Sequence, residues 1–204
     1  MADLKVTYFD HSGSRGEEVR LALTIAGVAF EDNRISHDAF GELKPALPFA
    51  ALPILEMDGR GVLAQTNAIL RLIGRQHGLY PDDLFAAARH DALMDAAEDL
   101  RHRIRPTMLM RDEAEKKAVR QQLAVDYIPQ WARGIEDLIG DGPFAGGAGP
   151  GVADIKLHMV DRWISGGGVD HIPGDVLDPY PRLKAVAEGI RSHPAVVAWY
   201  GDKR

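Results

Sequence analysis

The chain has 204 residues, of which 46% are hydrophobic and 26% charged, and its formal net charge at neutral pH is −6. This length suits one large or two small globular domains, and the negative charge gives no electrostatic reason to expect nucleic acid or an anionic membrane as a partner. Cysteine is absent, which excludes disulfides and thiolate zinc sites. Any thiol chemistry must therefore use a thiol that a ligand brings.

The first eighty residues predict a small α/β module. Residues 4–9 alternate in polarity as a strand does, residues 15–26 have helical spacing, and residues 28–35 predict a second strand. The β-α-β order predicts a right-handed parallel crossover. Residues 36–51 show no regular pattern, and we expect them to be irregular.

A hairpin and a helix complete this module. Pro53 has no N–H to give to a ladder, so it suits the entrance of a strand, where its peptide bond can be cis. The Asp-Gly pair at 58–59 predicts a hairpin turn, with residues 62–64 as the return strand. Thr66 or Asn67 is the expected cap of a helix that runs to about residue 77.

These elements predict a binding site. The backbone of Leu52, the amide of Gln65 and the hydroxyl of Thr66 meet at a helix N-terminus, where free N–H groups favour a carboxylate. We therefore expect a site for a small, peptide-like anion.

Beyond residue 80 the strand signal fades and helical patterns take over. The fold class is therefore α+β, with an α/β module followed by an all-helical one. The expected helices cover 86–111 with a kink at Pro106, 114–139 with an interruption at Pro129, 152–164, 181–191 and 194–199.

The motifs of both modules, in this order, resemble cytosolic glutathione transferases over essentially the whole chain. The closest resemblance is to the sigma-type branch, which uses a tyrosine. The motifs that carry it are Tyr8-Phe9, Arg15-Gly16-Glu17, Arg20-Leu21, Phe40 with Lys44, Leu47-Pro48-Phe49, Leu52-Pro53-Ile54-Leu55, Gln65-Thr66-x-Ala68-Ile69, Val152-Ala153-Asp154, Tyr180-Pro181-Arg182-Leu183 and His193-Pro194-x-Val196 with Trp199.

The resemblance implies a thioredoxin-like, glutathione-binding domain over residues 1–80. An all-helical domain over residues 81–204 would form the second-substrate pocket and part of a homodimer interface. It also implies a cytoplasmic detoxification enzyme that joins glutathione to a small electrophile, with no metal, nucleic acid or membrane involved. The lack of a signal-peptide core in residues 1–5 agrees with the cytoplasm.

The resemblance implies that Tyr8 activates the glutathione thiol. A cysteine-type thiol has a pKa of about 8.5, and lowering it by two units requires about 2.7 kcal/mol of selective stabilisation of the thiolate. One hydroxyl donor in a site partly closed to water can supply much of this energy. Ser12 in the following loop is the runner-up donor, and Arg15 would support the site. From position alone, the simpler interpretation of Tyr8 is a strand tyrosine that packs with Leu4 and Val6.

Glutathione itself is the co-substrate that the resemblance implies. Phe40 and Lys44 would approach its glycine end, and Leu52, beside Pro53, would pair with the cysteinyl backbone like an added strand. Taken alone, Lys44 is a solvated loop lysine.

The γ-glutamyl end has its own expected contacts. Gln65 and Thr66 would take its carboxylate, although an ordinary helix cap explains the same pair. Asp99 of the partner subunit, or the neighbouring Glu98, would meet its amine. A plain acidic helix face is the alternative for Glu98 and Asp99.

The chain departs from the family pattern at several positions. Phe40 stands where many relatives have Trp, Ala51 where they have Gln or Lys, and Thr66 where Ser is usual. These changes favour an alternative, a catalytically weak ligand-binding homologue. An isomerase or a peroxidase that uses the same thiolate is a further alternative. Gly151 replaces the usual Ser or Thr cap, while Asp154 is expected to stabilise the helical core rather than to catalyse.

Other patterns indicate no further site. The glycine-rich run at 146–151 lacks the Gly-Lys-Ser/Thr ending of a phosphate loop, and the histidines form no helical His-x-x-x-His pair. The basic cluster at 101–105 is most simply a solvated helix face or part of a dimer seam. An acidic second substrate is its other interpretation.

Overall fold

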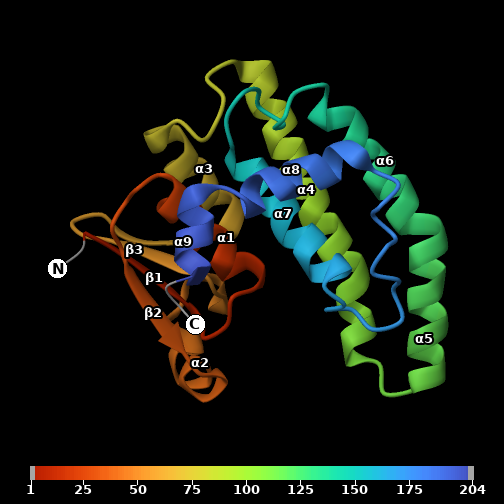
Figure 1. Cartoon of the computed structure of the whole chain (residues 1–204). Coiled ribbons are helices and arrows are strands. Elements are labelled where there is room, and N and C mark those ends of the chain that lie inside the picture. The colour runs from red at the N-terminus through yellow and green to blue at the C-terminus, as the bar shows by residue number, and fades with distance from the viewer. Residues whose placement is uncertain (1–2, 202–204) are drawn as a thin grey trace. The chain divides into compact units, whose positions relative to one another are not determined.

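The computed structural model describes residues 3–201. Contacts divide the chain into two compact units (Figure 1). The first unit runs to Tyr80 and takes in the segment from Ser192 onward, and the second is Pro81–Arg191. By its contacts, the segment from Ser192 therefore belongs with the first unit, although it follows the second in sequence. The outermost residues of the two expected domains, 1–2 and 202–204, lie outside the described part.

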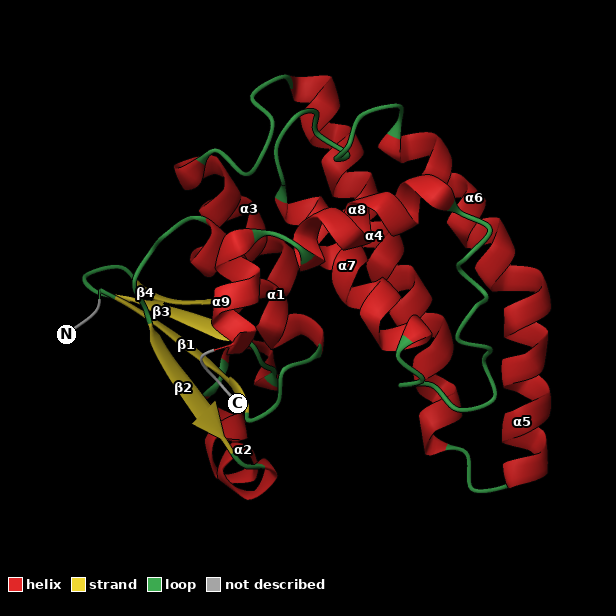
Figure 2. Cartoon of the chain, viewed as in Figure 1, coloured by secondary structure: helices red, strands yellow, loops and turns green. Residues whose placement is uncertain are grey.

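A four-stranded mixed sheet in the order β2-β1-β3-β4 forms the centre of the first unit (Figure 2). Its strands are β1 (Leu4–Phe9), β2 (Glu31–Ile35), β3 (Ile54–Met57) and β4 (Gly61–Ala64). β1 pairs parallel with β2 and antiparallel with β3, and β3 forms the hairpin with β4. The predicted β-α-β opening and hairpin are confirmed, but the second strand begins at Glu31 rather than at residue 28.

The core helices of this unit are α1 (Ser14–Ile25), α3 (Thr66–His77) and α9 (Pro194–Gly201). α1 lies against both α3 and α9, as Figure 1 shows for α9. Val6 of β1, Leu23 of α1 and Ile69 of α3 have no exposed surface. Burying each such side chain stabilises the unit by about 1.5–3 kcal/mol.

The expectation that residues 36–51 are irregular is wrong. They contain α2 (His37–Leu43) and the two short 3-10 turns η1 (Lys44–Ala46) and η2 (Pro48–Ala50). The side chain of Ser36 caps α2 by accepting the N–H of Ala39 at 3.1 Å. No residue of α2 is buried, so the helix has no apolar stripe from which periodicity could predict it.

The second unit consists of helices around one buried helix. They are α4 (Leu84–Ile104), α5 (Glu113–Gln122), α6 (Ile128–Ile139), α7 (Val152–Ser165) and α8 (Pro181–Arg191). α7 packs against α4 and α8, and its residues from Val152 to Val160 are buried. None of the helices in the described part is long and apolar enough to span a membrane.

Two predicted long helices are interrupted earlier than expected. The first ends at Ile104 and continues as the 3-10 turn η3 (Arg105–Leu109), one residue before Pro106. The second is divided by the π-helical turn η4 (Leu123–Tyr127), which precedes Pro129. Pro129 thus follows a π-helical turn in which the N–H of Ile128 donates to the carbonyl of Leu123. A proline lacks the N–H of a regular helix, and such a local change of helical geometry is a typical place for it.

Candidate active site

The strand register brings several predicted site residues to one end of the sheet. Tyr8 of β1 stands opposite Arg34 of β2. β1 pairs with β3 up to Thr7 and Ile54, and Ile54 pairs in turn with Ala64 of β4. One residue beyond these pairs lie Tyr8 within β1, Pro53 directly before β3 and Gln65 directly after β4. The peptide bond between Leu52 and Pro53 is cis, and both residues enter β3 at this end.

Tyr8 is held in a close-fitting environment. It is 6% exposed, and its ring lies against Gly16, where an added Cβ would come within 2.0 Å of two ring carbons. The guanidinium carbon of Arg20 lies 5.8 Å from the ring centroid. His11 meets the ring edge to face at 5.4 Å. The orientation of this tyrosine is therefore fixed by packing on several sides.

Arg20 is the structural centre of the loop that follows Tyr8. Its side chain has no exposed surface. Nη1 donates to the carbonyl of His11 at 3.0 Å and Nη2 to the carbonyl of Phe9 at 3.2 Å. It also pairs with Glu17 at 3.2 Å and with Asp32 at 2.7 Å. Burial alone would raise the pKa of Asp32, but the hydrogen bonds and charges of Arg34 and Arg20 outweigh it and lower that pKa.

The loop after β1 is also stabilised by a hydrogen bond between two of its own residues. The backbone N–H of Gly13 donates to Nδ1 of His11 at 3.1 Å, which requires the neutral imidazole. Burial, followed by the nearby Arg20 charge, lowers the pKa of His11. Ser12, the alternative thiol donor, lies in this loop, and Arg15 lies in the first turn of α1.

An aromatic cluster joins the loop to α2. Phe9 meets Phe40 at a centroid distance of 5.3 Å and His37 at 4.4 Å. Nζ of Lys44 lies 5.8 Å from the Phe40 ring. Tyr8 in turn meets Phe9 at 5.3 Å. A chain of ring contacts thus links Tyr8 to Phe40 and Lys44.

The start of α3 differs from the sequence expectation. Its N-cap is Gln65, not Thr66 or Asn67, and its side chain makes no capping hydrogen bond. Gln65 has φ 71° and ψ 110°, a strained conformation for a residue with a side chain. Gln65 is exposed and Thr66 is 6% exposed. Strain of this kind is concentrated at sites of function, because the surrounding structure must enforce it.

In the second unit, Glu98 and Asp99 have different environments. Glu98 accepts from Arg101 at 2.8 Å and from the fully buried Lys156 at 2.5 Å, so its carboxylate serves the packing of α4 on α7. Asp99 is exposed. Asp154, as expected, caps α7. It accepts the N–H of Gly151 at 2.7 Å and of Ala145 at 2.8 Å.

Comparison with known proteins identifies the family. The models described as "Glutathione S-transferase, N-terminal domain" and "Glutathione S-transferase, C-terminal domain" match residues 4–75 and 98–203. Glutathione S-transferase 1 of Ascaris suum is 34% identical, covering 100% of this chain and 98% of its own. The chain belongs to the glutathione S-transferase family.

Some relatives of this transferase are named as prostaglandin D synthases. Hematopoietic prostaglandin D synthase of Gallus gallus is 29% identical over 98% of this chain and 96% of its own. The structure of prostaglandin synthase D of Nilaparvata lugens has a TM-score of 0.86 at 27% identity, covering 98% of both chains. The expected fold is confirmed, with a thioredoxin-like domain followed by an all-helical one.

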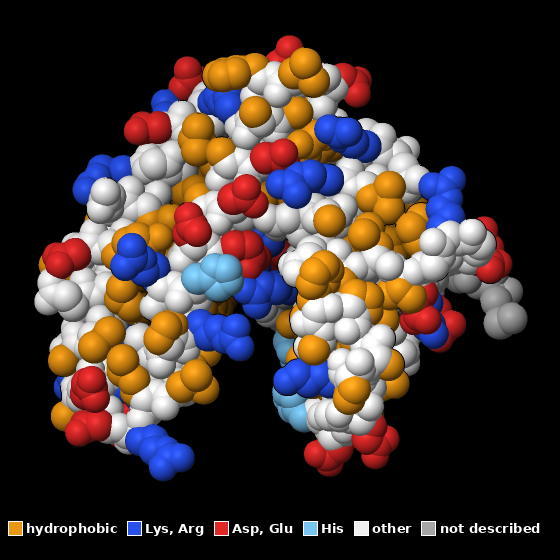
Figure 3. Space-filling model, turned by 180° about the vertical axis from the view of Figure 1, so that it is seen from behind, with side chains coloured by type: hydrophobic (Ala, Val, Ile, Leu, Met, Phe, Trp, Pro, Cys, Tyr) orange, Lys and Arg blue, Asp and Glu red, His pale blue; other side chains and the backbone are white. Residues whose placement is uncertain are grey.

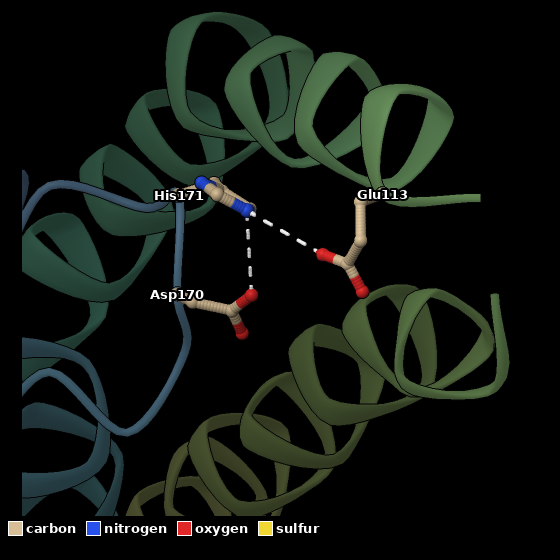
Figure 4. Close-up of side chains that lie close together, drawn as sticks. All are labelled: Glu113, Asp170 and His171. Atoms are coloured by element: carbon tan, nitrogen blue, oxygen red, sulfur yellow. Dashed lines mark ion pairs between the residues drawn. The ribbon is translucent and has the colours of Figure 1, made fainter. Parts of the chain in front are cut away.

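One cluster in the helical unit of the transferase has the residue types of a metal site. Glu113, Asp170 and His171 point toward one another (Figure 4), with Nε2 of His171 3.4 Å from Asp170 and 4.0 Å from Glu113. Asp170 is already paired with Arg120, and Lys116 pairs with Glu113 at 2.6 Å. Two cations thus neutralise the carboxylates, so the cluster acts as an ion-pair network that attaches a loop to α5.

A surface groove of about 540 Å³ lies elsewhere in the thioredoxin-like unit. It is lined by Leu4, Val28, Met57 and His77, at the end of β1 opposite to Tyr8. On the face seen from behind in Figure 3, basic and acidic side chains are interspersed. The groove is also lined by charged side chains, among them Asp58 and Arg60, but none of the predicted site residues lines it.

Sequence reasoning missed how the transferase secures the Tyr8 loop. Arg20 and Trp199 were noted as family motifs, but no contact was assigned to either residue. Trp199 Nε1 donates to Glu17 Oε1 at 2.8 Å, over 182 sequence positions. Residues 15–20 are mostly charged, so the sequence does not single out Glu17 and Arg20 as buried. Their spacing of three residues, which allows an ion pair on one helix face, is the sequence signal that could have indicated their pairing.

Proposed function

We propose that the protein is an active glutathione transferase of the sigma type, in which the Tyr8 hydroxyl hydrogen-bonds and stabilises the glutathione thiolate. The observation that carries this proposal is the packing of Tyr8 between Gly16 and the buried Arg20, at the sheet end shared with Pro53 and Gln65. A phenol fixed in this way loses little conformational entropy when it donates to a sulfur. A charge-assisted hydrogen bond is about twice as strong as a neutral one.

The chemistry follows from the thiolate. The thiol proton leaves to solvent, and the sulfur lone pair forms a carbon–sulfur bond to an electrophilic carbon. The displaced electron pair goes to a leaving group or into the electrophile's own π system. Tyr8 keeps its proton throughout and stabilises the negative sulfur, so the protein needs no general base.

Glutathione would occupy the Tyr8 end of the sheet. We assign its cysteinyl backbone to Leu52 beside cis-Pro53, its glycine end to Phe40 and Lys44, and its γ-glutamyl carboxylate to Gln65 and Thr66. The first turn of α3 supports the last assignment, because its free N–H groups favour an anion.

Several parts of the proposal concern the second unit and the assembly. Asp99 of the partner subunit would meet the γ-glutamyl amine, which the commitment of Glu98 to Lys156 supports. A homodimer is consistent with the exposed neighbours Leu84 and Phe85, which are 85% and 73% exposed. The helical domain would form the pocket for an apolar electrophile, and a cytoplasmic detoxification function completes the proposal.

A glutathione-dependent isomerase is the second candidate. The relatives named as prostaglandin D synthases favour it, because the same thiolate can add to a substrate and later leave it. The ligand-binding alternative rests on Phe40, Ala51 and Thr66, which remove or change side chains that many relatives have.

The test is the ultraviolet thiolate absorbance of bound glutathione as a function of pH, for wild type, Tyr8→Phe and Ser12→Ala. Calorimetry first confirms saturation of each protein. We expect an apparent thiol pKa well below 8.5 in wild type and Ser12→Ala, and a higher one in Tyr8→Phe. A low pKa in Tyr8→Phe with a raised one in Ser12→Ala would assign the thiol donor to Ser12. Failure of wild type to bind glutathione would favour the ligand-binding homologue.

A further inference from the structure

We propose that Glu17, Arg20 and Trp199 form a positioning network through which the C-terminal helix α9 sets the ionisation of the glutathione thiol. This inference rests on the proposed role of Tyr8 as thiol donor. It adds that the donor's alignment depends on a hydrogen bond from Trp199, a residue far along the chain from Tyr8.

The network begins at the backbone next to Tyr8. Arg20 donates to the carbonyls of Phe9 and His11, the first and third residues after Tyr8. Because the carbonyl of Phe9 belongs to the residue adjacent to Tyr8, a shift of the guanidinium moves the end of β1 and the start of its loop. The same guanidinium lies 5.8 Å from the Tyr8 ring centroid. Contact between a guanidinium and an aromatic ring at this distance is favourable, so Arg20 also helps to hold the ring of Tyr8 in place.

Glu17 connects Arg20 to α9. Its carboxylate has no exposed surface, so its oxygens depend on protein donors. Oε2 accepts from Arg20 at 3.2 Å and Oε1 from Trp199 at 2.8 Å. A buried carboxylate that loses one hydrogen-bond donor either rotates toward water or moves closer to the donor that is left, here Arg20. Either response displaces Arg20 relative to Tyr8.

Trp199 is itself held in place. Its ring lies 5.8 Å from that of Phe30, in the segment before β2, and α9 packs on α1. The indole can therefore be shortened to a phenyl ring while the apolar contact with Phe30 is largely kept. This allows the hydrogen bond to be tested separately from the packing.

The experiment measures the apparent pKa of the bound glutathione thiol in Trp199→Phe, with Tyr8→Phe and Trp163→Phe as references. Trp163 lies in α7 of the second unit and controls for loss of a tryptophan in general. We expect Trp199→Phe to raise the thiol pKa by about half a unit, a threefold smaller thiolate-to-thiol ratio at fixed pH, and Trp163→Phe to leave it unchanged. Glu17→Gln keeps an acceptor for Trp199 but removes the charge facing Arg20, and it serves as the second variant if Trp199→Phe does not fold.

The outcomes separate this inference from the proposed function. A raised pKa in Tyr8→Phe with a wild-type value in Trp199→Phe, or in Glu17→Gln where that variant replaces it, would overturn the network and leave the donor intact. Wild-type values in both the Tyr8 and the network variants would overturn the donor and, with it, the network. A shift equal in Trp163→Phe and Trp199→Phe would indicate a general loss of stability and would also overturn the inference.

Discussion

Gly16 lies so close to the ring of Tyr8 that a Cβ at position 16 would come 2.0 Å from the ring atoms Cγ and Cδ1. No side chain fits there unless the ring or the helix moves. The first turn of α1 is thus shaped to fit the tyrosine that precedes it by eight positions.

The substitution Gly16→Ala should therefore displace Tyr8. We expect it to lower the free energy of unfolding by about 1–3 kcal/mol through overpacking, and to raise the pKa of the bound glutathione thiol. Denaturant titration and the ultraviolet thiolate signal measure the two effects. Gly41→Ala in α2 is the matched control, because a Cβ there meets nothing within 4 Å. Equal behaviour of the two variants would contradict the steric argument.

Gln65 provides a test that separates backbone strain from ligand binding. Gln65→Gly removes the cost of the positive φ, about 1 kcal/mol, while it deletes the side-chain amide. We expect unchanged or higher stability together with roughly tenfold weaker glutathione binding, the loss of about one hydrogen bond. Gln65→Ala should weaken binding equally without the gain in stability. Calorimetric affinity and denaturant midpoints are the measurements, and undiminished binding in both variants would remove Gln65 from the site.

Asp154 should give the helical unit a distinctive pH dependence. Burial raises the pKa of its carboxyl from 3.8 to about 6, so between these values the folded state binds more protons than the unfolded one. The contribution of Asp154 to stability therefore falls as pH rises from about 4 to 6. In Asp154→Asn this slope should vanish, and stability should drop by about 1–3 kcal/mol at neutral pH, because one N–H loses its acceptor. Denaturant unfolding across this range tests both, and an unchanged slope would argue against the shift.

His90 should make the stability of the helical unit depend on pH in the direction opposite to Asp154. Burial lowers its pKa from 6.5 to about 4, so the unfolded state binds the proton more readily between these values. The contribution of neutral His90 to the free energy of unfolding is fully present above pH 6.5 and is lost as the pH falls toward 4. We expect His90→Gln to lose less stability than wild type on acidification from pH 6.5. The comparison with Asp154→Asn separates the two opposing slopes.

The cluster of Glu113, Asp170 and His171 should be indifferent to metal ions. Thermal unfolding in the presence of a chelator, of Ca²⁺ or of Zn²⁺ is expected to give one midpoint, because Arg120 and Lys116 already neutralise the carboxylates. Asp170→Asn should lower the midpoint, since the buried guanidinium of Arg120 then keeps Thr107 Oγ1 at 2.7 Å but loses its anion. A rise in the wild-type midpoint with either ion would show that the cluster binds metal.

Much of the fold was predictable because it rests on local patterns. The bounds of α3 and α8 follow from apolar periodicity and from a glycine or proline at their ends, and the hairpin follows from its Asp-Gly turn. α2 was missed because its residues are not buried, so its only signal was the cap at Ser36. The π-helical turn before α6 inserts one residue into a helix without any change in composition, and it therefore leaves no periodic trace.

The residues of the candidate site could be predicted from the sequence, but the contacts and backbone conformations that hold them in place could not. Tyr8, Pro53 and Gln65 reach one end of the sheet through strand register, which alternation and turn chemistry specify. The conformation of Gln65 could not be foreseen, because a positive φ at a residue other than glycine is imposed by tertiary structure. The contact of Glu17 with Trp199 joins positions 182 residues apart, which no local pattern can encode.

The grouping of the segment from Ser192 with the first unit has a consequence for synthesis. A ribosome delivers the sheet, α1 and α3 first, and then all of the second unit, before α9 emerges. Domains generally fold as they are made, starting from the N-terminus. Trp199, whose indole N–H donates to the buried Glu17 of α1, is nevertheless synthesised after the whole second unit. The first unit therefore lacks α9 and the hydrogen bond from Trp199 to Glu17 until this segment has been translated. A chain cut short after α8 would leave Glu17 without its distant donor.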